Sequence, residues 1–92
     1  MGAREHKVES YLQRCVRERG GMSLKWVSTG VPGVPDQIVF LEGRVHLVEV
    51  KTVDGRLSPG QKRTHEKLAA QGFPVTTVYG RDDVDRLMES WL

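Results

Sequence analysis

Two acidic residues and a lysine have spacings that suit phosphodiester hydrolysis. Asp36 follows Pro35, and after a gap of 12 residues Glu49 and Lys51 stand two positions apart in an apolar run. Two carboxylates within a few ångströms repel each other, and a divalent cation relieves that repulsion. Mg²⁺ prefers oxygen ligands and commonly takes one or two carboxylates together with phosphate oxygens. A lysine beside them would orient a water molecule and balance negative charge, so the three residues predict a metal-assisted hydrolase.

Each of these residues also has a purely structural interpretation. Glu49 and Lys51 alternate onto one face of a strand, where an ion pair near its exposed end would explain both. Asp36 beside a proline is common as a turn or cap residue. The single cysteine and the scattered histidines have no zinc-binding spacing. The hydrolase interpretation therefore requires that the three side chains converge, which depends on the elements that carry them.

A predicted hairpin brings the three residues together. Residues 37–41 and 44–52 are rich in valine, isoleucine, leucine and phenylalanine, and Glu42-Gly43 between them forms a tight turn. Residues 29–35 contain two prolines and two glycines, which predict a shaped loop rather than a regular element. Because the hairpin folds back on itself, Asp36 at the start of its first strand lies beside the end of its second.

The remaining elements follow from periodicity and from start and stop signals. Ser58 predicts an N-cap, Pro59 the first helical position, and Gln61 the partner of a capping box. Apolar residues in the N-terminal part repeat with the period of a helix, and a run of β-branched residues indicates a strand. Glycines mark where the helices end. Besides the hairpin, we predict a helix over residues 3–19, a strand over 24–28, a helix from 59 to about 71, a strand over 75–79, and a last helix capped by Asp82 or Asp83.

The predicted order is helix, three strands, helix, strand and helix, which is an α/β arrangement. A helix between the third and fourth strands is a crossover, so these strands should be parallel, while the preceding hairpin is antiparallel. We therefore expect a mixed sheet flanked by helices, with an extra C-terminal helix.

Composition agrees with one small globular domain over residues 1–92. The chain is 38% hydrophobic and 28% charged, and its formal net charge of +2 permits a nucleic-acid partner without requiring one. The lone cysteine and the absence of an apolar leader run favour an intracellular, cytoplasmic protein. No apolar run reaches the roughly 18 residues of a membrane-spanning helix, so we expect no membrane partner.

Four sequence features together resemble a known family. They are Glu9, the glycine-rich and proline-rich loop leading into Pro35-Asp36, the run Glu49-Val50-Lys51, and Ser58-Pro59-x-Gln61. Over about residues 5–79 they resemble the VRR-NUC nucleases of the PD-(D/E)XK superfamily. The resemblance implies a restriction-endonuclease-like αβββαβ core, a Mg²⁺ or Mn²⁺ cofactor, and cleavage of DNA. Stand-alone members of this size look like phage or bacterial enzymes, and the family association is with branched DNA such as Holliday junctions, cut by homodimers.

The resemblance also implies roles for individual residues. Asp36 and Glu49 match the metal ligands, the Val50 carbonyl matches a further ligand, and Lys51 matches the catalytic lysine. Glu9 takes the role of the acidic residue on the first helix.

Two of these assignments have alternatives. Glu5 lies one turn before Glu9 and nearer the centre of the apolar face, so it competes for the role of the first-helix acid. Gln61 fits the capping box, and in the family the matching glutamine belongs to the active site; we predict the functional role. His65 shares its helical stripe, and we interpret it as a polar residue at the edge of the core.

Basic side chains on two helices are candidates for phosphate contacts, because lysine and arginine supply affinity that does not depend on sequence. They are Arg14, Arg17, Lys62, Arg63 and Lys67. The same chemistry on DNA flaps, linear duplexes or RNA is the main alternative function, and a binding module without catalysis is another. Clustered acids argue against the latter, because they repel phosphate.

Overall fold

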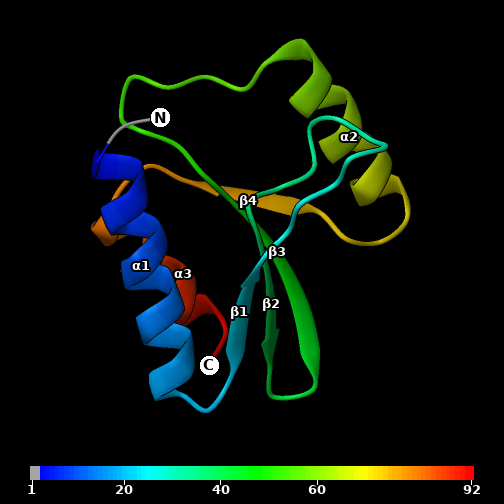
Figure 1. Ribbon diagram of the computed structural model, residues 1–92. Helices are drawn as coiled ribbons and strands as arrows, with labels where there is room; N and C mark the ends of the chain where they lie inside the picture. Colours follow the sequence, from blue (N-terminus) through cyan, green and yellow to red (C-terminus); the bar gives the residue numbers. More distant parts are fainter. Residues whose placement is uncertain (1–2) are drawn as a thin grey trace.

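The computed structural model describes residues 3–92, in which a four-stranded sheet is flanked by helices (Figure 1). Neighbouring strands follow the order β1-β2-β3-β4; the first two pairs are antiparallel, and β3 and β4 are parallel. This confirms the predicted mixed sheet with an extra C-terminal helix. The elements are α1 (Ala3–Glu18), β1 (Met22–Lys25), β2 (Gln37–Leu41), β3 (Arg44–Val50), α2 (Pro59–Ala70), β4 (Val75–Val78) and α3 (Arg81–Ser90).

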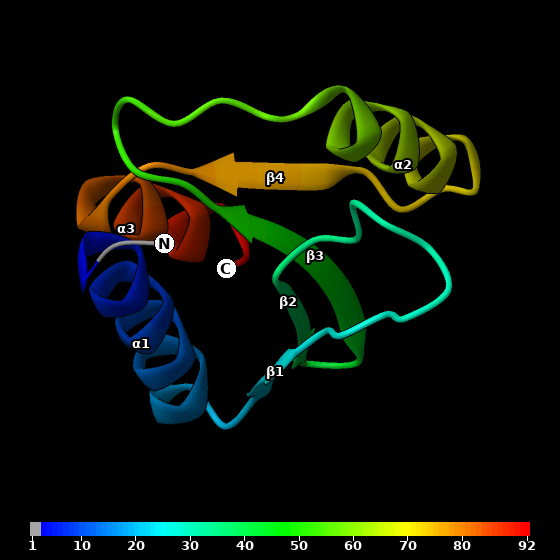
Figure 2. The same cartoon turned by 45° about the horizontal axis from the view of Figure 1, so that its top comes forward.

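The main core lies between the sheet and two of the helices. α1 and α3 lie side by side on one side of the sheet, and α2 lies beside β4 away from them (Figures 1 and 2). Val8, Leu12 and Val16 recur every four residues on α1, so they form one buried stripe. Burial of each such side chain stabilises the fold by about 1.5–3 kcal/mol. The buried cluster is completed by Val39, Leu41, Val48, Val50, Val78, Val84 and Met88.

The hairpin turn fixes the register of β2 and β3. Glu42 has φ 52° and Gly43 has φ 78°, and two consecutive residues with positive φ match the twist of a two-residue hairpin. Gln37 pairs with Val48 in this register, so Asp36 comes opposite the carboxyl end of β3. The predicted convergence of the hairpin ends is therefore a consequence of the turn.

The start of α2 follows the predicted signals. Ser58 is the N-cap, its side chain accepts the Gln61 backbone N–H, and the Gln61 side chain accepts the Ser58 backbone N–H. The helix ends before Gly72, whose φ of 96° is a left-handed conformation that stops the helix without steric cost. The capping box places Gln61 on the first turn of α2, facing the end of β3.

The predicted boundaries of three elements are wrong by more than one residue. β1 begins at Met22 and ends at Lys25, whereas residues 24–28 were expected, because its side chains are mostly exposed and leave no apolar signal. β3 ends at Val50 rather than at residue 52. The N-cap of α3 is Gly80; Asp83 lies inside the first turn, where its carboxylate accepts the Tyr79 backbone N–H.

Candidate active site

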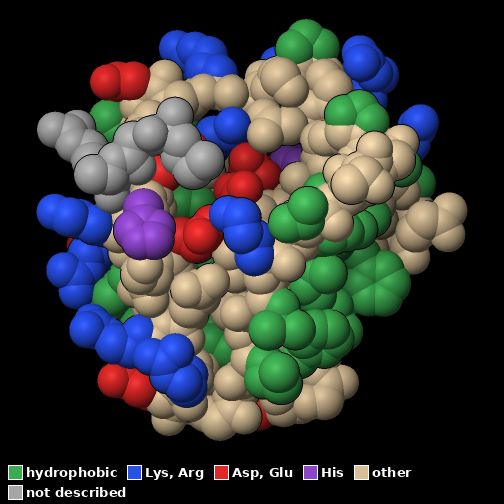
Figure 3. Space-filling view, in the orientation of Figure 1, with side chains coloured by type: hydrophobic (Ala, Val, Ile, Leu, Met, Phe, Trp, Pro, Cys, Tyr) green, Lys and Arg blue, Asp and Glu red, His purple; other side chains and the backbone are tan. Residues whose placement is uncertain are grey.

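A cavity of about 380 Å³ opens between the N-terminal half of α1, the ends of the first three strands and the start of α2. Figure 3 shows acidic side chains at the centre of this face with basic side chains next to them. The cavity is lined by Glu5, His6, Glu9, Lys25, Asp36, Glu49, Val50, Lys51 and Gln61. The predicted metal ligands, the predicted catalytic lysine and both candidates for the first-helix acid thus surround one space.

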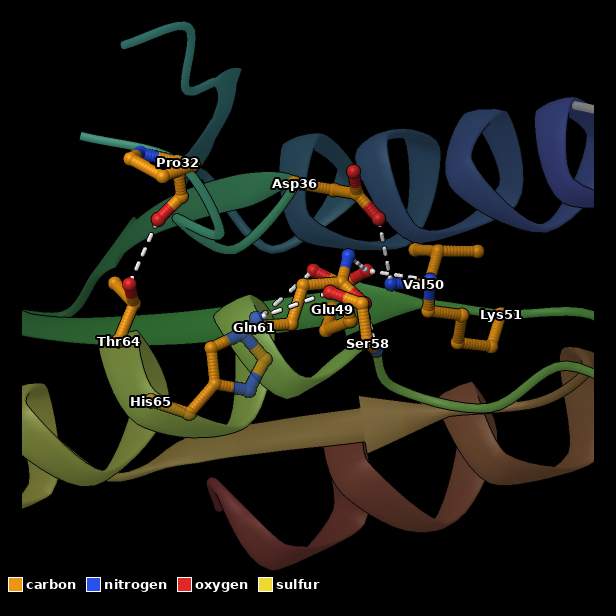
Figure 4. A network of polar contacts seen from close by, with 9 residues as sticks. All are labelled: Pro32, Asp36, Glu49, Val50, Lys51, Ser58, Gln61, Thr64 and His65. Carbon is orange, nitrogen blue, oxygen red and sulfur yellow. Dashed lines mark hydrogen bonds and ion pairs between the residues drawn. The ribbon is translucent and has the colours of Figure 1, made fainter. Parts of the chain in front are cut away.

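Asp36 is held by the backbone of the neighbouring strand. Its Oδ2 atom accepts the Val50 backbone N–H at 2.8 Å, and its own carbonyl accepts the Trp26 N–H at 2.9 Å (Figure 4). The carboxylate is therefore anchored across the mouth of the hairpin and faces Glu49. The turn or cap role considered from the sequence does not describe this contact, because the partner is a residue on another strand.

Glu49 is the most unusual side chain of the molecule. It is 1% exposed, and its Oε2 atom lies 3.5 Å from the Lys51 Nζ and accepts a hydrogen bond from the Gln61 Nε2 at 3.2 Å. Its Oε1 atom is buried and has no hydrogen-bond partner among the described residues. Burial and the nearby Asp36 carboxylate raise the pKa of Glu49 to about 7, against the opposing effect of Lys51. This carboxylate is costly to keep in the fold.

Lys51 gives the ion pair that the structural interpretation expected, yet the pair is incomplete. One carboxylate oxygen of Glu49 faces Lys51 and the other faces no donor within hydrogen-bond distance in the described chain. Lys51 also lines the open cavity, with 17% of its side chain exposed. An ion pair that served only stability would satisfy both oxygens of a buried carboxylate. The arrangement instead leaves room for a ligand.

Gln61 completes the predicted capping box and also contacts Glu49, and its role in the active site stays a prediction. Its Oε1 atom accepts the Ser58 N–H at 2.9 Å, which completes the capping box, while its Nε2 donates to Glu49 (Figure 4). A single amide has both a donor and an acceptor end, so the two functions do not compete.

His65 lies closer to the site than its sequence context indicated. It is buried, and its Nε2 atom is 3.9 Å from Glu49 Oε1, with no hydrogen-bond partner in the described chain. Burial and the Lys51 charge lower the pKa of His65 below the usual value of a histidine. The helical stripe shared with Gln61 was the only signal that pointed to this position.

The two candidate acids on α1 both line the cavity. Glu9 pairs with Lys25 of β1, whose Nζ lies 3.5 Å from its Oε1 atom, while Glu5 lies one turn earlier. No sequence signal connects Lys25 with the site, because its contact with Glu9 joins two elements that meet only in the folded chain. The choice between Glu9 and Glu5 stays a prediction.

The loop before Asp36 is fastened to α2. The Thr64 hydroxyl donates to the Pro32 carbonyl at 2.7 Å. Gly33 has φ 85°, and a Cβ atom there would lie 2.6 Å from the Gly60 carbonyl oxygen, so only glycine fits. Asp36 and Gln61 are thus positioned by two segments that are in direct contact.

The residues present suit a divalent cation in part. Among residues 3–92 no group of three acidic, histidine or cysteine side chains is assembled for metal binding, and Glu9 is engaged by Lys25. Asp36 and Glu49, however, are two facing carboxylates, and Glu49 has a buried, unpartnered oxygen and a raised pKa. Mg²⁺ and similar ions commonly take one or two carboxylates and complete their shell with water and phosphate. A cation between Asp36 and Glu49 would remove the cost of this arrangement.

The predicted phosphate contacts lie outside the cavity. Their side chains are exposed, two of them on α1 and three on α2.

None of the helices in the described part of the chain is long and apolar enough to cross a membrane.

Comparison with known proteins shows the family to which the chain belongs. The family model described as the VRR-NUC domain matches residues 4–82. The chain belongs to the VRR-NUC family. It is 39% identical over 80 residues to "Putative nuclease p44" of Acyrthosiphon pisum secondary endosymbiont phage 1, and the match covers 86% of each chain.

Two solved structures share the VRR-NUC fold. One, described as "VRR_NUC domain", is 31% identical, with a TM-score of 0.90 over 99% of this chain and 100% of that one. The other, described as "VRR_NUC domain protein", is 18% identical, with a TM-score of 0.74 over 100% of this chain and 90% of that one. The second likeness concerns the fold alone. The protein is therefore a nuclease-family domain whose cavity is the candidate active site.

Proposed function

We propose that this VRR-NUC protein is a divalent-cation-dependent, structure-selective DNA endonuclease, with branched DNA such as Holliday junctions as its substrate class. The observation that carries the hydrolytic part is Glu49. It is a buried carboxylate with one unpartnered oxygen, beside Asp36 and Lys51, at the base of an open cavity. The branched-DNA part comes from the family resemblance.

Asp36 and Glu49 would hold a Mg²⁺ or Mn²⁺ ion, with the Val50 carbonyl as a further ligand. When bound, such an ion lowers the pKa of a coordinated water and polarises a phosphoryl oxygen. Glu9 of α1 would contribute a further carboxylate to the same site. For this, Lys25 would leave its ion pair with Glu9 and contact a phosphate of the DNA.

The other side chains of the cavity do the positioning. Lys51 lies beside Glu49 with its ammonium group in the cavity, where it orients the attacking water and offsets the charge that develops on the phosphate. Gln61 holds the Glu49 carboxylate in place, because its Nε2 atom donates a hydrogen bond to it. The exposed basic side chains of α1 and α2 hold the DNA arms by their phosphates.

Symmetric cleavage of a junction needs two active sites, so we infer a two-fold homodimer. The candidate surfaces are the last helix and the first strands. Val84 and Met88 of α3 are buried in the core, whereas β1, β2 and β3 present a row of apolar side chains to solvent. Met22 pairs with Phe40, and Phe40 pairs with Val45, and these three are 56%, 43% and 40% exposed. A contiguous apolar face of this kind fits a second copy of the chain.

The dimer is tested by sedimentation of two variants. Phe40→Glu places a charge in the apolar row and should give monomers. Val53→Glu changes a residue that is 72% exposed outside that row and should leave the dimer intact. If the wild-type protein is a monomer, or if Phe40→Glu leaves the dimer intact, the proposed interface is wrong.

The nuclease is tested with labelled four-way junction, flap, linear duplex and RNA, each with Mg²⁺, with Mn²⁺ and with chelator. We expect cutting of the junction only with metal. Glu49→Ala and Lys51→Ala should fold and bind DNA yet cut at least about a hundredfold more slowly. Glu66→Gln, an exposed acid on α2, is the matched control and should cut like wild type.

The outcomes separate the alternatives. Faster cutting of flap, duplex or RNA than of the junction would replace the substrate class and keep the chemistry. Binding of the junction without any cutting in either metal would favour a module without catalysis. Full activity of Glu49→Ala would place the active site elsewhere.

A further inference from the structure

A second pocket, of about 470 Å³, lies on the other side of α1 from the core and is strongly basic. It is formed by the exposed face of α1 together with the first residue of α3. Among the described residues, no acidic side chain lines it. Its lining is His6, Lys7, Ser10, Tyr11, Arg14, Arg17 and Arg81, and we call it the α1/α3 pocket.

The positive charges of the α1/α3 pocket have no acidic partners. Arg19, Lys25, Lys51 and Arg86 all form ion pairs, whereas Lys7, Arg14, Arg17 and Arg81 form none within the described chain. Four unneutralised cations around one concave surface repel each other and attract an anion. Only Arg14 and Arg17 were candidates from the sequence; Arg81 joins them because α3 packs beside α1.

Tyr11 forms the floor of the α1/α3 pocket and fixes two of its arginines. The guanidinium carbon of Arg81 lies 4.2 Å from the centre of the Tyr11 ring, and that of Arg14 lies 5.3 Å from it. The Tyr11 hydroxyl donates to Asp85 of α3 at 2.5 Å, a contact that raises the pKa of Tyr11 to about 12. The Tyr11 hydroxyl therefore stays protonated, and the Asp85 carboxylate is turned toward it. Arginines held on an aromatic face lose less freedom when they bind a phosphate.

The α1/α3 pocket adjoins the catalytic cavity. His6 lines both of them, so a chain that leaves the cavity across the N-terminal half of α1 enters the pocket without a gap. Lysine and arginine side chains run along the α1 edge in Figure 3, next to the central acids. From Lys7 to Arg17 the helix rises by about 15 Å. One strand of a duplex carries a phosphate about every 3.4 Å along its axis, so this length spans roughly four phosphates.

We propose that the α1/α3 pocket is a second phosphate-binding site, which grips the backbone of the DNA strand that continues from the catalytic cavity. The proposal rests on the nuclease function and adds the course of the substrate over the molecule. Lys7, Arg14, Arg17 and Arg81 contact successive phosphates, while Asp36, Glu49 and Lys51 act on the scissile one. Because none of the contacts reads a base, the pocket binds DNA irrespective of sequence.

The experiment measures the affinity of fluorescein-labelled duplex and junction DNA by anisotropy, in chelator, over about 50 to 200 mM salt. Arg14→Gln/Arg81→Gln should bind about tenfold or more weakly, with a salt slope reduced by about two phosphate contacts. Lys7→Gln/Arg17→Gln should behave in the same way, and it leaves both arginines on the Tyr11 ring in place. The matched control, Arg44→Gln/Arg56→Gln, removes two exposed charges outside the pocket and should bind like wild type with nearly its slope.

The outcomes separate this proposal from the nuclease. If both pocket variants bind DNA like the control, the pocket is not a phosphate site, whatever the protein cuts. If they bind weakly while the wild-type protein cuts no substrate with any metal, the pocket stands and the nuclease function falls. Equal weakening in the pocket and control variants would reduce the effect to net charge and overturn the proposal.

Discussion

The candidate active-site cavity and the α1/α3 pocket hold charges in opposite ways. In the cavity Glu49 is 1% exposed, and its oxygen Oε1 has no hydrogen-bond partner in the described chain. In the pocket Lys7, Arg14, Arg17 and Arg81 are all exposed. Removing an ion from water costs several kcal/mol, whereas an exposed charge costs almost nothing. The buried Glu49 of the cavity therefore lowers the stability of the fold, whereas the exposed basic residues of the pocket lower it little.

This difference indicates what each region is for. A buried, incompletely partnered carboxylate weakens the fold, so we attribute its presence at the end of β3 to the proposed chemistry rather than to stability. Exposed cations around a neutral ring add affinity over a broad surface without a demand on the core. Mutations in the cavity should accordingly change stability and activity together, and those in the pocket should change binding alone.

The largest effect on stability is expected from the titration of Glu49. Its pKa is raised from 4.5 to about 7 by burial, so the unfolded chain loses this proton at lower pH than the folded one. The contribution to the free energy of unfolding is zero below about pH 4.5, becomes unfavourable as the pH rises to about 7, and is constant above. Glu49→Gln removes this pH-dependent contribution, because glutamine does not ionise.

Melting temperatures in chelator at about pH 5 and about pH 8 measure this contribution. We expect the melting temperature of Glu49→Gln, relative to that of wild type, to be higher at pH 8 than at pH 5. Glu66→Gln should show no such change relative to wild type. An equal difference between Glu49→Gln and wild type at both pH values would mean that the carboxylate is not desolvated as the cavity requires.

A smaller effect is expected where the loop before Asp36 contacts α2. Gly33→Ala puts a Cβ 2.6 Å from the Gly60 oxygen at a positive φ, which should cost about 1–3 kcal/mol of unfolding free energy and slow cutting. Gly30→Ala meets nothing within 4 Å and should be close to neutral. Denaturant titration of both variants measures the difference. DNA binding by the α1/α3 pocket should be the same in both, because the loop does not line it.

The smallest effect separates the two roles of Gln61. Ser58→Ala removes the hydroxyl that accepts the Gln61 backbone N–H and should cost about 1 kcal/mol, with little change in cutting. Gln61→Ala loses the return hydrogen bond of the capping box and also the donor to Glu49. Its cutting rate should fall about tenfold below that of Ser58→Ala. Equal rates for the two variants would limit Gln61 to helix capping.

The hairpin and α2 could be predicted from the sequence because their signals are local. Glu42-Gly43 sets a turn within two residues, and Ser58, Pro59 and Gln61 mark the start of a helix within four. Once the turn is fixed, the meeting of Asp36 with Glu49 follows from register alone. The family resemblance then added roles that spacing does not supply.

The rest depends on contacts between distant segments. β1 is an edge strand with exposed side chains, so no buried pattern marked its start at Met22. The contacts of Lys25 with Glu9 and of Arg81 with Tyr11 join residues 16 and 70 positions apart. His65 approaches Glu49 only because α2 packs over the end of β3. Tertiary packing, rather than local propensity, decided each of these positions.

We infer above all that Asp36 and Glu49 share a divalent cation. Calorimetric titration of the metal-free protein with Mn²⁺ at about pH 8, above the raised pKa of Glu49, measures this binding. We expect Mn²⁺ to bind wild type and Glu66→Gln equally, and to bind both Glu49→Gln and Asp36→Asn at least about tenfold more weakly, a difference of about 1.4 kcal/mol. Mn²⁺ binding to Glu49→Gln as tight as to wild type would mean that the two carboxylates share no cation.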